Sequence, residues 1–341
     1  MKLISFIKDQ YEYVGIQQFD KVYKMPTLHK FLPRTMQRLL EKWEAYMEIA
    51  LEAEIRLKTD PERQKLGIPI DEVEMLAPVP HPGSLRDGYA FRQHVLTARR
   101  NRGLDMTPVF DEFPVFYFGN HKTVRGPGAI RCMPDHFRQL DYELEVAVVI
   151  CKTGINIRAA DADQYIGGLM IMNDFSARLF QMEEMQLSLG PAKGKDFVTT
   201  TGPWLVTLNE LEPFLCPPQP GHVGKNWDLS MQARVGGVVQ SFGSLADMHW
   251  TFAELIERAS YGVQLYPGDI IGSGTVGTGC FLELNGTKKL EDPDFIPRWL
   301  QPEETVELEV EGLGILRNKI VKAEDDFSIL DLKKNKRSVH S

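Results

Sequence analysis

The chain has 341 residues, of which 43% are hydrophobic and 25% charged, values typical of a globular protein with a sizeable core. Its formal net charge of -8 argues against nucleic acid or an anionic membrane as the main partner. No run approaches the roughly 18 apolar residues of a membrane span, and Met1–Gln10 carries charges where a signal peptide is apolar. The four cysteines match no zinc or redox spacing. We therefore expect a cytoplasmic protein with reduced thiols.

The first part of the chain is predicted to form a small α+β subdomain. Residues 1–24 alternate like a β-hairpin, with Tyr11–Gly15 as the turn region. Residues 34–58 repeat apolar side chains every three or four positions, which predicts one helical face. Because Pro61 and Gly67–Pro69 end that pattern, the subdomain is assigned to residues 1–76 and a larger domain to 77–341. The basic run Lys333–Arg337 is expected to be a solvated end.

The larger domain is predicted to be mostly β with some α, an α+β class. Helices are expected near 86–100, 174–187 and 251–261. Since strands are many and do not alternate with helices, a doubly wound sheet is not expected. Short apolar runs predict strands at Val115–Phe118, Glu143–Cys151, Tyr165–Met172, Gly202–Thr207, Leu229–Val235, Asp269–Gly272 and Phe281–Leu284.

Two glutamates stand at the start of one of these strands. Side chains alternate on a strand, so Glu143 and Glu145 share a face about 7 Å apart. Two converging carboxylates repel unless a cation or a proton lies between them. Ala147 and Val149 continue the same face, which predicts that it becomes buried. On this segment alone, a solvated strand end remains the simpler interpretation.

A second cluster of polar residues follows the strand Tyr165–Met172. Asp174, Arg178 and Gln181 are spaced so that one helical stripe would carry all three. Asp174 could equally cap the helix and pair with Arg178. The segment by itself does not choose between a functional and a structural role.

Three further motifs carry polar side chains. The first is Asp87-Gly-Tyr89-Ala-Phe-Arg-Gln-His94. The second, Gly190–Phe197 with Lys195, has the wrong glycine spacing and no Ser or Thr after its lysine, so we reject nucleotide binding. The third is the glycine loop with Thr275, followed by Glu283 inside the expected strand Phe281–Leu284. A glutamate in such a strand needs a partner.

Taken together, the order and spacing of these motifs resemble the fumarylacetoacetate hydrolase family. The matching stretches run from about Asp87 to Thr287. The resemblance implies a mixed β-sandwich roll and a homodimer. It also implies that Asp87, Glu143, Glu145 and Asp174 ligate one divalent cation. An all-oxygen set suits Mg²⁺ best, with Ca²⁺ or Mn²⁺ as alternatives.

The resemblance also implies the reaction and the roles of the remaining residues. The expected activity is hydrolysis of a carbon–carbon bond in a fumarylacetoacetate-like or acylpyruvate-like β-diketo acid, as in aromatic amino acid catabolism. His94, oriented by Glu283, would activate water. Lys195, Arg178 and Gln181 would stabilise negative charge, and Tyr89 and Thr275 would contact the substrate together with Arg178 and Gln181.

Alternatives and departures from the family pattern stay open at this point. The chain could instead be a hydratase, isomerase or decarboxylase of a 2-oxo or hydroxydienoic acid, or a cation-binding protein without activity. Met182–Gln186 stands where the animal enzyme has a substrate-binding tyrosine, so the acyl pocket is not defined. One of Arg99, Arg100 and Arg102 is expected to bind a substrate carboxylate.

Overall fold

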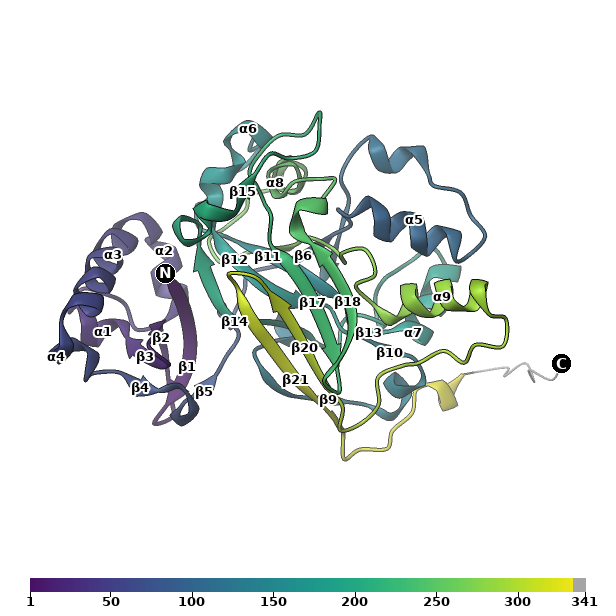
Figure 1. Cartoon of the computed structure of the whole chain (residues 1–341), viewed down its shortest axis with the longest axis horizontal. Helices are drawn as coiled ribbons and strands as arrows, with labels where there is room; N and C mark the ends of the chain where they lie inside the picture. Colours follow the sequence, from purple (N-terminus) through teal and green to yellow (C-terminus); the bar gives the residue numbers. More distant parts are fainter. Residues whose placement is uncertain (334–341) are drawn as a thin grey trace.

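Strands from distant parts of the chain gather into two sheets in the computed structural model, which describes residues 1–333 (Figure 1). Residues 334–341, which include most of the basic run Lys333–Arg337, lie outside the described residues. Among the described residues, no helix has the length and apolar character needed to cross a membrane.

The first 76 residues form a curved hairpin backed by helices, at the left of Figure 1. The predicted turn at Tyr11–Gly15 is wrong, because Tyr11 already begins a strand and the chain turns at Asp9 and Gln10, which both have positive φ. The predicted helix over 34–58 forms as two consecutive helices. The elements are β1 (Lys2–Lys8), β2 (Tyr11–Gln18), β3 (Lys21–Lys24), α1 (Met25–Leu28), α2 (Met36–Glu41), α3 (Trp43–Thr59), α4 (Pro61–Gln64), β4 (Ile68–Pro69) and β5 (Glu74–Met75).

The strands of residues 1–76 continue the main sheet, whose other strands belong to the rest of the chain. β1 pairs antiparallel with β14, with Leu3 opposite Leu205, so the order is β4-β3-β2-β1-β14-β12-β11-β19-β6-β7, with β5 beside β1 and β8 beside β14. The body strands of this sheet are β6 (Leu85–Gly88), β7 (Phe116–Gly119), β8 (Val124–Arg125), β11 (Leu144–Ile150), β12 (Ile166–Asn173), β14 (Thr199–Thr207) and β19 (Ile270–Gly272).

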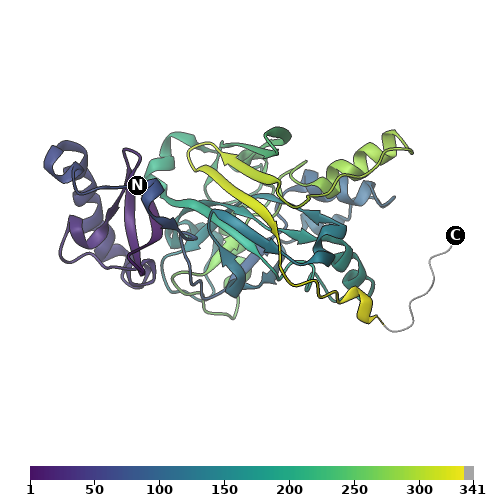
Figure 2. The same cartoon turned by 90° about the horizontal axis from the view of Figure 1, so that it is seen from below.

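A second sheet packs on one face of the first, as the view from below shows (Figure 2). Its order is β18-β17-β20-β21-β9. Both sheets contain parallel as well as antiparallel pairs. Its strands are β9 (Gly128–Cys132), β17 (Ser230–Val235), β18 (Val238–Ser244), β20 (Thr305–Val310) and β21 (Gly314–Lys322). Two mixed sheets face to face agree with the predicted sandwich roll.

The central strands of the main sheet are buried on both faces, which explains their continuous apolar sequence. Val146 and Val148 of β11 belong to the core shared with the second sheet. Ala147 and Val149 point to the opposite face, into the core formed with α2 and α3. The face that Glu143 and Glu145 begin is therefore buried further along, as predicted.

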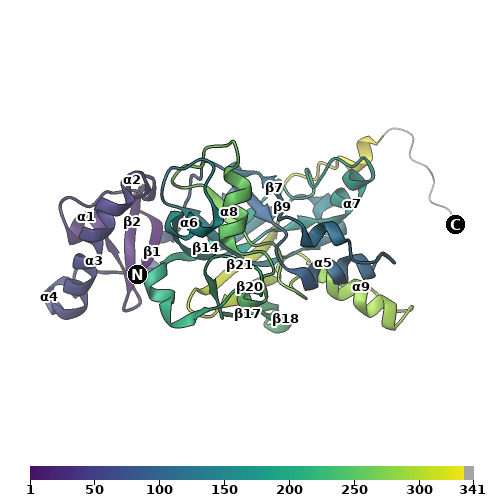
Figure 3. The same cartoon turned by 90° about the horizontal axis from the view of Figure 1, so that it is seen from above.

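The remaining helices flank the sheets, and α5 and α9 lie side by side at one end of the molecule (Figures 1 and 3). Three sequence predictions fail here. Residues 86–91 form β6 and a short connection, not the start of a helix; α7 begins at Arg178, not at 174; and Phe281–Leu284 opens a helix, not a strand. The helices are α5 (Arg92–Arg100), α6 (Ala159–Ala162), α7 (Arg178–Gln186), α8 (Phe252–Ser260) and α9 (Phe281–Glu291).

The α+β class is confirmed, with helix and strand in comparable amounts. Short strand pairs and turns complete the description. The pairs are β10 (Leu140–Asp141) with β13 (Ser176–Ala177), and β15 (Leu215–Cys216) with β16 (Asn226–Trp227). The 3₁₀ turns are η1 (Ile70–Glu72), η2 (Pro108–Asp111), η3 (His121–Thr123), η4 (Pro134–Arg138), η5 (Asp163–Tyr165), η6 (Leu208–Phe214), η7 (Leu245–Asp247) and η8 (Leu330–Leu332).

Candidate active site and metal centre

Neighbouring strands of the main sheet bring the predicted acidic residues to one place. Asp87 of β6 lies opposite Gly272 of β19, and Gly272 lies opposite Ala147 of β11. On the other side of β11, Leu144 pairs with Asn173, the last residue of β12. Residues as far apart in sequence as Asp87 and Gly272 therefore meet where these strands begin or end.

Three buried carboxylates converge at that place. One oxygen from each of Asp87, Glu143 and Glu145 lies within 4.8 Å of the others. Asp87 Oδ1 accepts from the backbone N–H of Gly274 at 3.1 Å, and Glu145 Oε1 accepts from Thr275 Oγ1 at 3.2 Å. Glu145 Oε2 is buried and has no hydrogen-bond partner within residues 1–333. A buried oxygen without a partner in an all-oxygen group fits a hard divalent cation.

Glycine is required where the backbone closes on this group. Gly274 has φ +79°, and a Cβ there would lie 2.6 Å from the carbonyl oxygen of Gly88. A side chain at position 274 would therefore push the loop away from β6 and move away the N–H group that donates a hydrogen bond to Asp87. Gly274 thus allows close contact between two backbone segments.

The pKa values of two of these carboxyl groups are raised. Burial, followed by the nearby charges of Asp174 and Glu143, raises the pKa of Asp87 to about 8. Burial and the charges of Asp87 and Glu143 raise the pKa of Glu145 well above its ordinary value. Protein without a bound cation is therefore expected to hold a proton at this group at neutral pH.

Binding of a divalent cation at this group is consequently expected to release protons. A carboxyl whose pKa is about 8 is protonated at pH 7 and must lose its proton to ligate a cation. The apparent affinity should rise with pH up to about pH 8, by roughly tenfold per unit for each proton released. Calorimetry in buffers with different ionisation enthalpies measures the proton count. A dissociation constant that stays the same from about pH 6 to pH 8 would contradict this assignment of protons.

Two buried cations, Lys195 and Arg178, contact Glu143, and Lys195 also contacts Asp174, the fourth predicted acidic residue. Lys195 Nζ lies between Glu143 and Asp174, 2.5 Å from Asp174 Oδ2. Arg178 Nη2 donates to Glu143 Oε1 at 2.8 Å. Burial alone would raise the pKa of Glu143, but the charges of Lys195 and Arg178 bring it down to about 2. Glu143 is therefore ionised at every physiological pH.

Asp174 lies outside the group of three converging carboxylates. Besides Lys195, its oxygens accept from the hydroxyl of Tyr117 and, at 3.2 Å, from Thr199 Oγ1. Because α7 begins at Arg178, Asp174 does not share a helical stripe with Arg178 and Gln181. Its role as a metal ligand stays a prediction.

Asp141 is a residue whose role sequence analysis missed. It accepts from Arg178 Nε at 2.9 Å and from the first N–H groups of α9, at Phe281 and Leu282. This fully buried carboxylate thus joins the start of α7 to the start of α9, which carries Glu283. The sequence did offer one indication of this role: Asp141 lies two residues before Glu143, and in an extended chain side chains two residues apart point to the same side.

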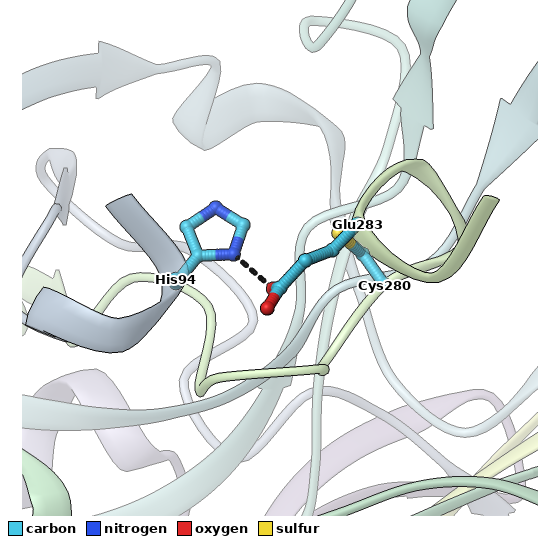
Figure 4. Close-up of side chains that lie close together, drawn as sticks. All are labelled: His94, Cys280 and Glu283. Atoms are coloured by element: carbon cyan, nitrogen blue, oxygen red, sulfur yellow. Dashed lines mark hydrogen bonds and ion pairs between the residues drawn. The ribbon is translucent and has the colours of Figure 1, made fainter. Parts of the chain in front are cut away.

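His94 and Glu283 form a buried pair between α5 and α9 (Figure 4). His94 Nδ1 lies 2.7 Å from Glu283 Oε2, and the other oxygen of Glu283 accepts from the backbone N–H of Thr278 at 2.9 Å. Thr278 has φ +67°, a left-handed conformation that turns its N–H toward the helix. The glutamate expected inside a strand thus lies in the first turn of a helix, with both oxygens engaged.

A cavity of about 550 Å³ joins the histidine to the acidic group. Most of the predicted site residues border it: Asp87, Tyr89, His94, Glu143, Arg178, Gln181, Lys195 and Thr275. The other predicted residues, Glu145, Asp174 and Glu283, are buried and do not border the cavity. Of the three candidate arginines, Arg102 borders the cavity. Tyr117, which also borders it, was missed because a tyrosine in an apolar strand gives no signal.

Apolar side chains form the part of the cavity wall that the sequence left undefined. Met182 and Met185 of α7 border the cavity, together with Leu282 of α9 and Trp299. These positions include the stretch where the family pattern places a tyrosine. The cavity therefore combines a charged end with an apolar wall, as substrate pockets commonly do.

The loop that carries Lys195 is fastened to α7 by one carboxylate. Glu184 accepts from the backbone N–H groups of Ala192 at 3.0 Å, Lys193 at 2.6 Å and Gly194 at 3.3 Å. These bonds fix the residues immediately before Lys195. Glu184 is therefore a positioning residue for the buried lysine.

Replacing Glu184 with alanine should release this loop and lower kcat/KM by about tenfold, since several backbone donors lose their shared acceptor. Steady-state kinetics and limited proteolysis of the loop measure the two effects. The matched control is Glu183→Ala, which removes only an ion pair with Lys333. Equal kinetics for the two variants would show that the loop holds Lys195 without Glu184.

Comparison with known proteins agrees with this architecture. The family model described as "Fumarylacetoacetate (FAA) hydrolase C-terminal" matches residues 84–321. Fumarylacetoacetase from Arabidopsis thaliana is 30% identical over 327 residues, covering 79% of this chain and 74% of that protein. Oxaloacetate tautomerase YisK from Bacillus subtilis (strain 168) is 28% identical over 323 residues, covering 93% and 95%.

Solved structures share the fold. Fumarylacetoacetate hydrolase from psychrophilic Exiguobacterium antarcticum matches with a TM-score of 0.66 at 23% identity, and 2-hydroxyhepta-2,4-diene-1,7-dioate isomerase from Mycobacterium marinum with 0.62 at 21%. Each match covers 95% of this chain and 100% of the other. The family model alone spans more than half of the chain. The chain belongs to the fumarylacetoacetate hydrolase family.

Proposed function

We propose that this chain is a metal-dependent hydrolase that cleaves a carbon–carbon bond in a fumarylacetoacetate-like or acylpyruvate-like β-diketo acid. The observation that carries the proposal is the hydrogen-bonded His94–Glu283 pair, because His94 borders the same cavity as the acidic group. A base held by a buried carboxylate is what activation of water requires, whereas binding of a cation alone does not require it.

Asp87, Glu143 and Glu145 would hold the cation, with Asp174 as the predicted fourth ligand on the far side of Lys195. Mg²⁺ fits the oxygen ligands best, and Ca²⁺ or Mn²⁺ are the alternatives. When bound, the cation would polarise the oxygens of the substrate as a Lewis acid. Once its three carboxylates are ionised, the acidic group keeps excess negative charge after Lys195 and Arg178 are counted, which favours a dication there.

His94 would act as the general base through Nε2. Because Nδ1 faces the carboxylate of Glu283, Nδ1 carries the hydrogen and Nε2 keeps its lone pair. A water at Nε2 gives up a proton and attacks the carbonyl carbon next to the scissile bond. The charge of Glu283 stabilises the imidazolium that forms, and the imidazolium later returns the proton to the departing carbon.

Donors on the opposite wall would stabilise the negative charge that develops. Lys195 and Arg178 are buried cations at the charged end of the cavity. Gln181 accepts from Arg178 Nη1 through its oxygen at 2.9 Å, which leaves its amide nitrogen to donate to substrate. Tyr89 and Thr275, which border the cavity, would contact polar groups of the substrate. Fixed donors of this kind stabilise an oxyanion without reorganising.

A tautomerase or isomerase acting on a 2-oxo acid is the second candidate. The names of the Bacillus subtilis and Mycobacterium marinum relatives favour it. The cavity argues against a small substrate such as oxaloacetate. Its volume is about 550 Å³, and part of its wall is apolar, at Met182, Met185 and Trp299. That volume is in the range of sites for larger ligands.

Ultraviolet absorbance distinguishes the two candidates. The protein with Mg²⁺ is incubated separately with an acylpyruvate, fumarylacetoacetate, a hydroxydienoate and enol-oxaloacetate. Hydrolysis removes the diketone absorbance and yields two acids. Turnover of the dienoate or of oxaloacetate, with both diketo acids untouched, would exclude the hydrolase. No turnover of any of them would favour a cation-binding protein.

Among the three candidate arginines, Arg102 is expected to bind the substrate carboxylate. Replacing Arg102 with alanine should raise KM by about 10- to 100-fold with a smaller effect on kcat, because one charged hydrogen bond is lost. Arg100→Ala is the matched control, since Arg100 donates to Thr287 on the outside of α9. If Arg100→Ala raises KM and Arg102→Ala does not, the assignment is reversed.

Assembly and location stay predictions. We propose a homodimer, and the mass of the purified protein in solution measures it. The cytoplasmic location is likewise a proposal, which fractionation of cells that produce the full chain would test.

A further inference from the structure

A cysteine that the proposed reaction does not use lies beside the catalytic pair. Cys280 immediately precedes α9 and is fully buried. One ligand atom from each of His94, Cys280 and Glu283 lies within 4.8 Å of the others. In Figure 4 the sulfur of Cys280 lies next to the base of the Glu283 side chain, and the imidazole approaches from α5. The three side chains thus form a second compact group of potential metal ligands.

The ligand types differ from those of the acidic group. Sulfur and nitrogen ligands favour Zn²⁺ and similar ions, whereas an all-oxygen set favours Mg²⁺. We propose that His94, Cys280 and Glu283 form an inhibitory site for Zn²⁺ or another thiolate-preferring dication, separate from the group at Asp87, Glu143 and Glu145. The charge of the surroundings agrees with a cation there.

Negative charge surrounds the sulfur. Burial, followed by the charge of Asp141, raises the pKa of the Cys280 thiol well above its ordinary value, and Glu143 and Glu283 add to the effect. The thiol is therefore neutral in protein without zinc. The same carboxylates that disfavour a thiolate favour a dication, which would neutralise the thiolate that it creates.

Binding replaces two hydrogens by one metal ion. Zn²⁺ bonds to Cys280 Sγ, and the thiol proton goes to solvent. The ion also takes the place of the hydrogen between His94 Nδ1 and Glu283 Oε2, which are 2.7 Å apart and must separate slightly. The hydrogen that leaves Nδ1 ends on Nε2 of the same ring, so one proton is released in total.

The consequence for turnover rests on the proposed function. A ring with hydrogen on Nε2 and metal on Nδ1 cannot accept a proton from water, so kcat should fall. Glu143, Arg178 and Lys195, which face the substrate, are not ligands of this ion. KM should therefore change little, and added substrate should not relieve the inhibition.

Zinc titration of the Mg²⁺-saturated protein tests the inhibitory effect. Each variant is compared with its own zinc-free activity. Wild type and Cys132→Ser, a control at another fully buried cysteine, should lose kcat equally. Cys280→Ser should need roughly 100-fold more zinc, because an alcohol is a far weaker zinc ligand than a thiolate. Inhibition that is equal in Cys280→Ser and wild type, or that excess Mg²⁺ abolishes, would overturn the proposal.

A spectroscopic measurement needs no activity and no variant. Co²⁺ added to the Mg²⁺-saturated wild type should give a near-ultraviolet thiolate-to-cobalt charge-transfer band, which Zn²⁺ then removes. The absence of that band overturns the site even if Cys280→Ser fails to fold. If the band appears but no substrate is turned over, the site stands and the proposed hydrolase function fails.

Discussion

His94→Ala should lower kcat by about 100- to 10,000-fold while leaving the dissociation constant for Mg²⁺ nearly unchanged. The reason is the separation of the two groups of ligands. His94 lies at hydrogen-bond distance from Glu283, whereas the proposed Mg²⁺ ligands are the converging carboxylates of Asp87, Glu143 and Glu145. Stopped assays of diketone loss measure kcat, and calorimetry measures the affinity for Mg²⁺.

The controls separate loss of the base from loss of structure. Imidazole added to His94→Ala should restore part of the activity, since the cavity beside His94 can admit a small base. His81→Ala, at an exposed histidine paired with Glu12, should behave as wild type. Unchanged turnover in His94→Ala would remove this residue as the base, and loss of Mg²⁺ binding would mean that the two groups are not independent.

Glu145→Gln is expected to abolish stabilisation by Mg²⁺ without destabilising the metal-free protein at neutral pH. Burial and neighbouring carboxylates raise the pKa of Glu145 well above its ordinary value, which favours its neutral form in metal-free protein. Glutamine has the same shape but cannot supply the charge that a dication needs. Affinity for Mg²⁺ should fall by roughly 100-fold or more, with a parallel loss of turnover.

Thermal unfolding in a chelator and in Mg²⁺ measures both parts of this prediction. Wild type should gain a Tm increase that grows with Mg²⁺ concentration, because the ion binds only the folded state. Glu145→Gln should match wild type in the chelator and gain nothing from Mg²⁺. Glu54→Gln, at a buried glutamate of α3 far from the cavity, should keep the increase. A full Mg²⁺ response in Glu145→Gln would exclude Glu145 as a ligand.

Sequence analysis predicted the parts of the fold that depend on strand periodicity. β11 and β12 begin and end within about two residues of their predicted bounds, because strands buried on both faces read as continuous apolar runs. The shared face of Glu143 and Glu145 followed from alternation along the same strand. Convergence with Asp87 depends instead on the pairing of β6 with β19, which local periodicity does not encode.

Helix starts were harder to predict from the sequence. Phe281–Leu284 is short and apolar, so its period could not distinguish a strand from the first turn of a helix. The start of this helix is stabilised by Asp141, which accepts hydrogen bonds from the N–H groups of Phe281 and Leu282 although it lies about 140 residues away in sequence. Likewise, Leu85–Gly88 looked continuous with α5 because its strand partners lie far along the chain.

The separation of Asp174 from the other carboxylates was also beyond local reasoning. Lys195 and Tyr117 both contact Asp174, but they lie in segments distant in sequence from β12, so no local sequence pattern connects them with Asp174. Spacings of four and three residues, which fit one helical stripe, suggested that Asp174 belongs with Arg178 and Gln181. The structure shows instead that Arg178 pairs with Asp141 and Glu143. Which charges neutralise one another in a buried cluster is decided by packing in three dimensions.

The most direct test of carbon–carbon hydrolysis follows a heavy oxygen isotope from water into product. An acylpyruvate is incubated with the protein and Mg²⁺ in isotopically labelled water, and the products are analysed by mass spectrometry. We expect pyruvate and a carboxylic acid that carries one labelled oxygen in its new carboxylate, with no cleavage in a chelator or in His94→Ala. Recovery of intact substrate that has only exchanged its tautomer, with no new acid formed, would contradict the hydrolase assignment.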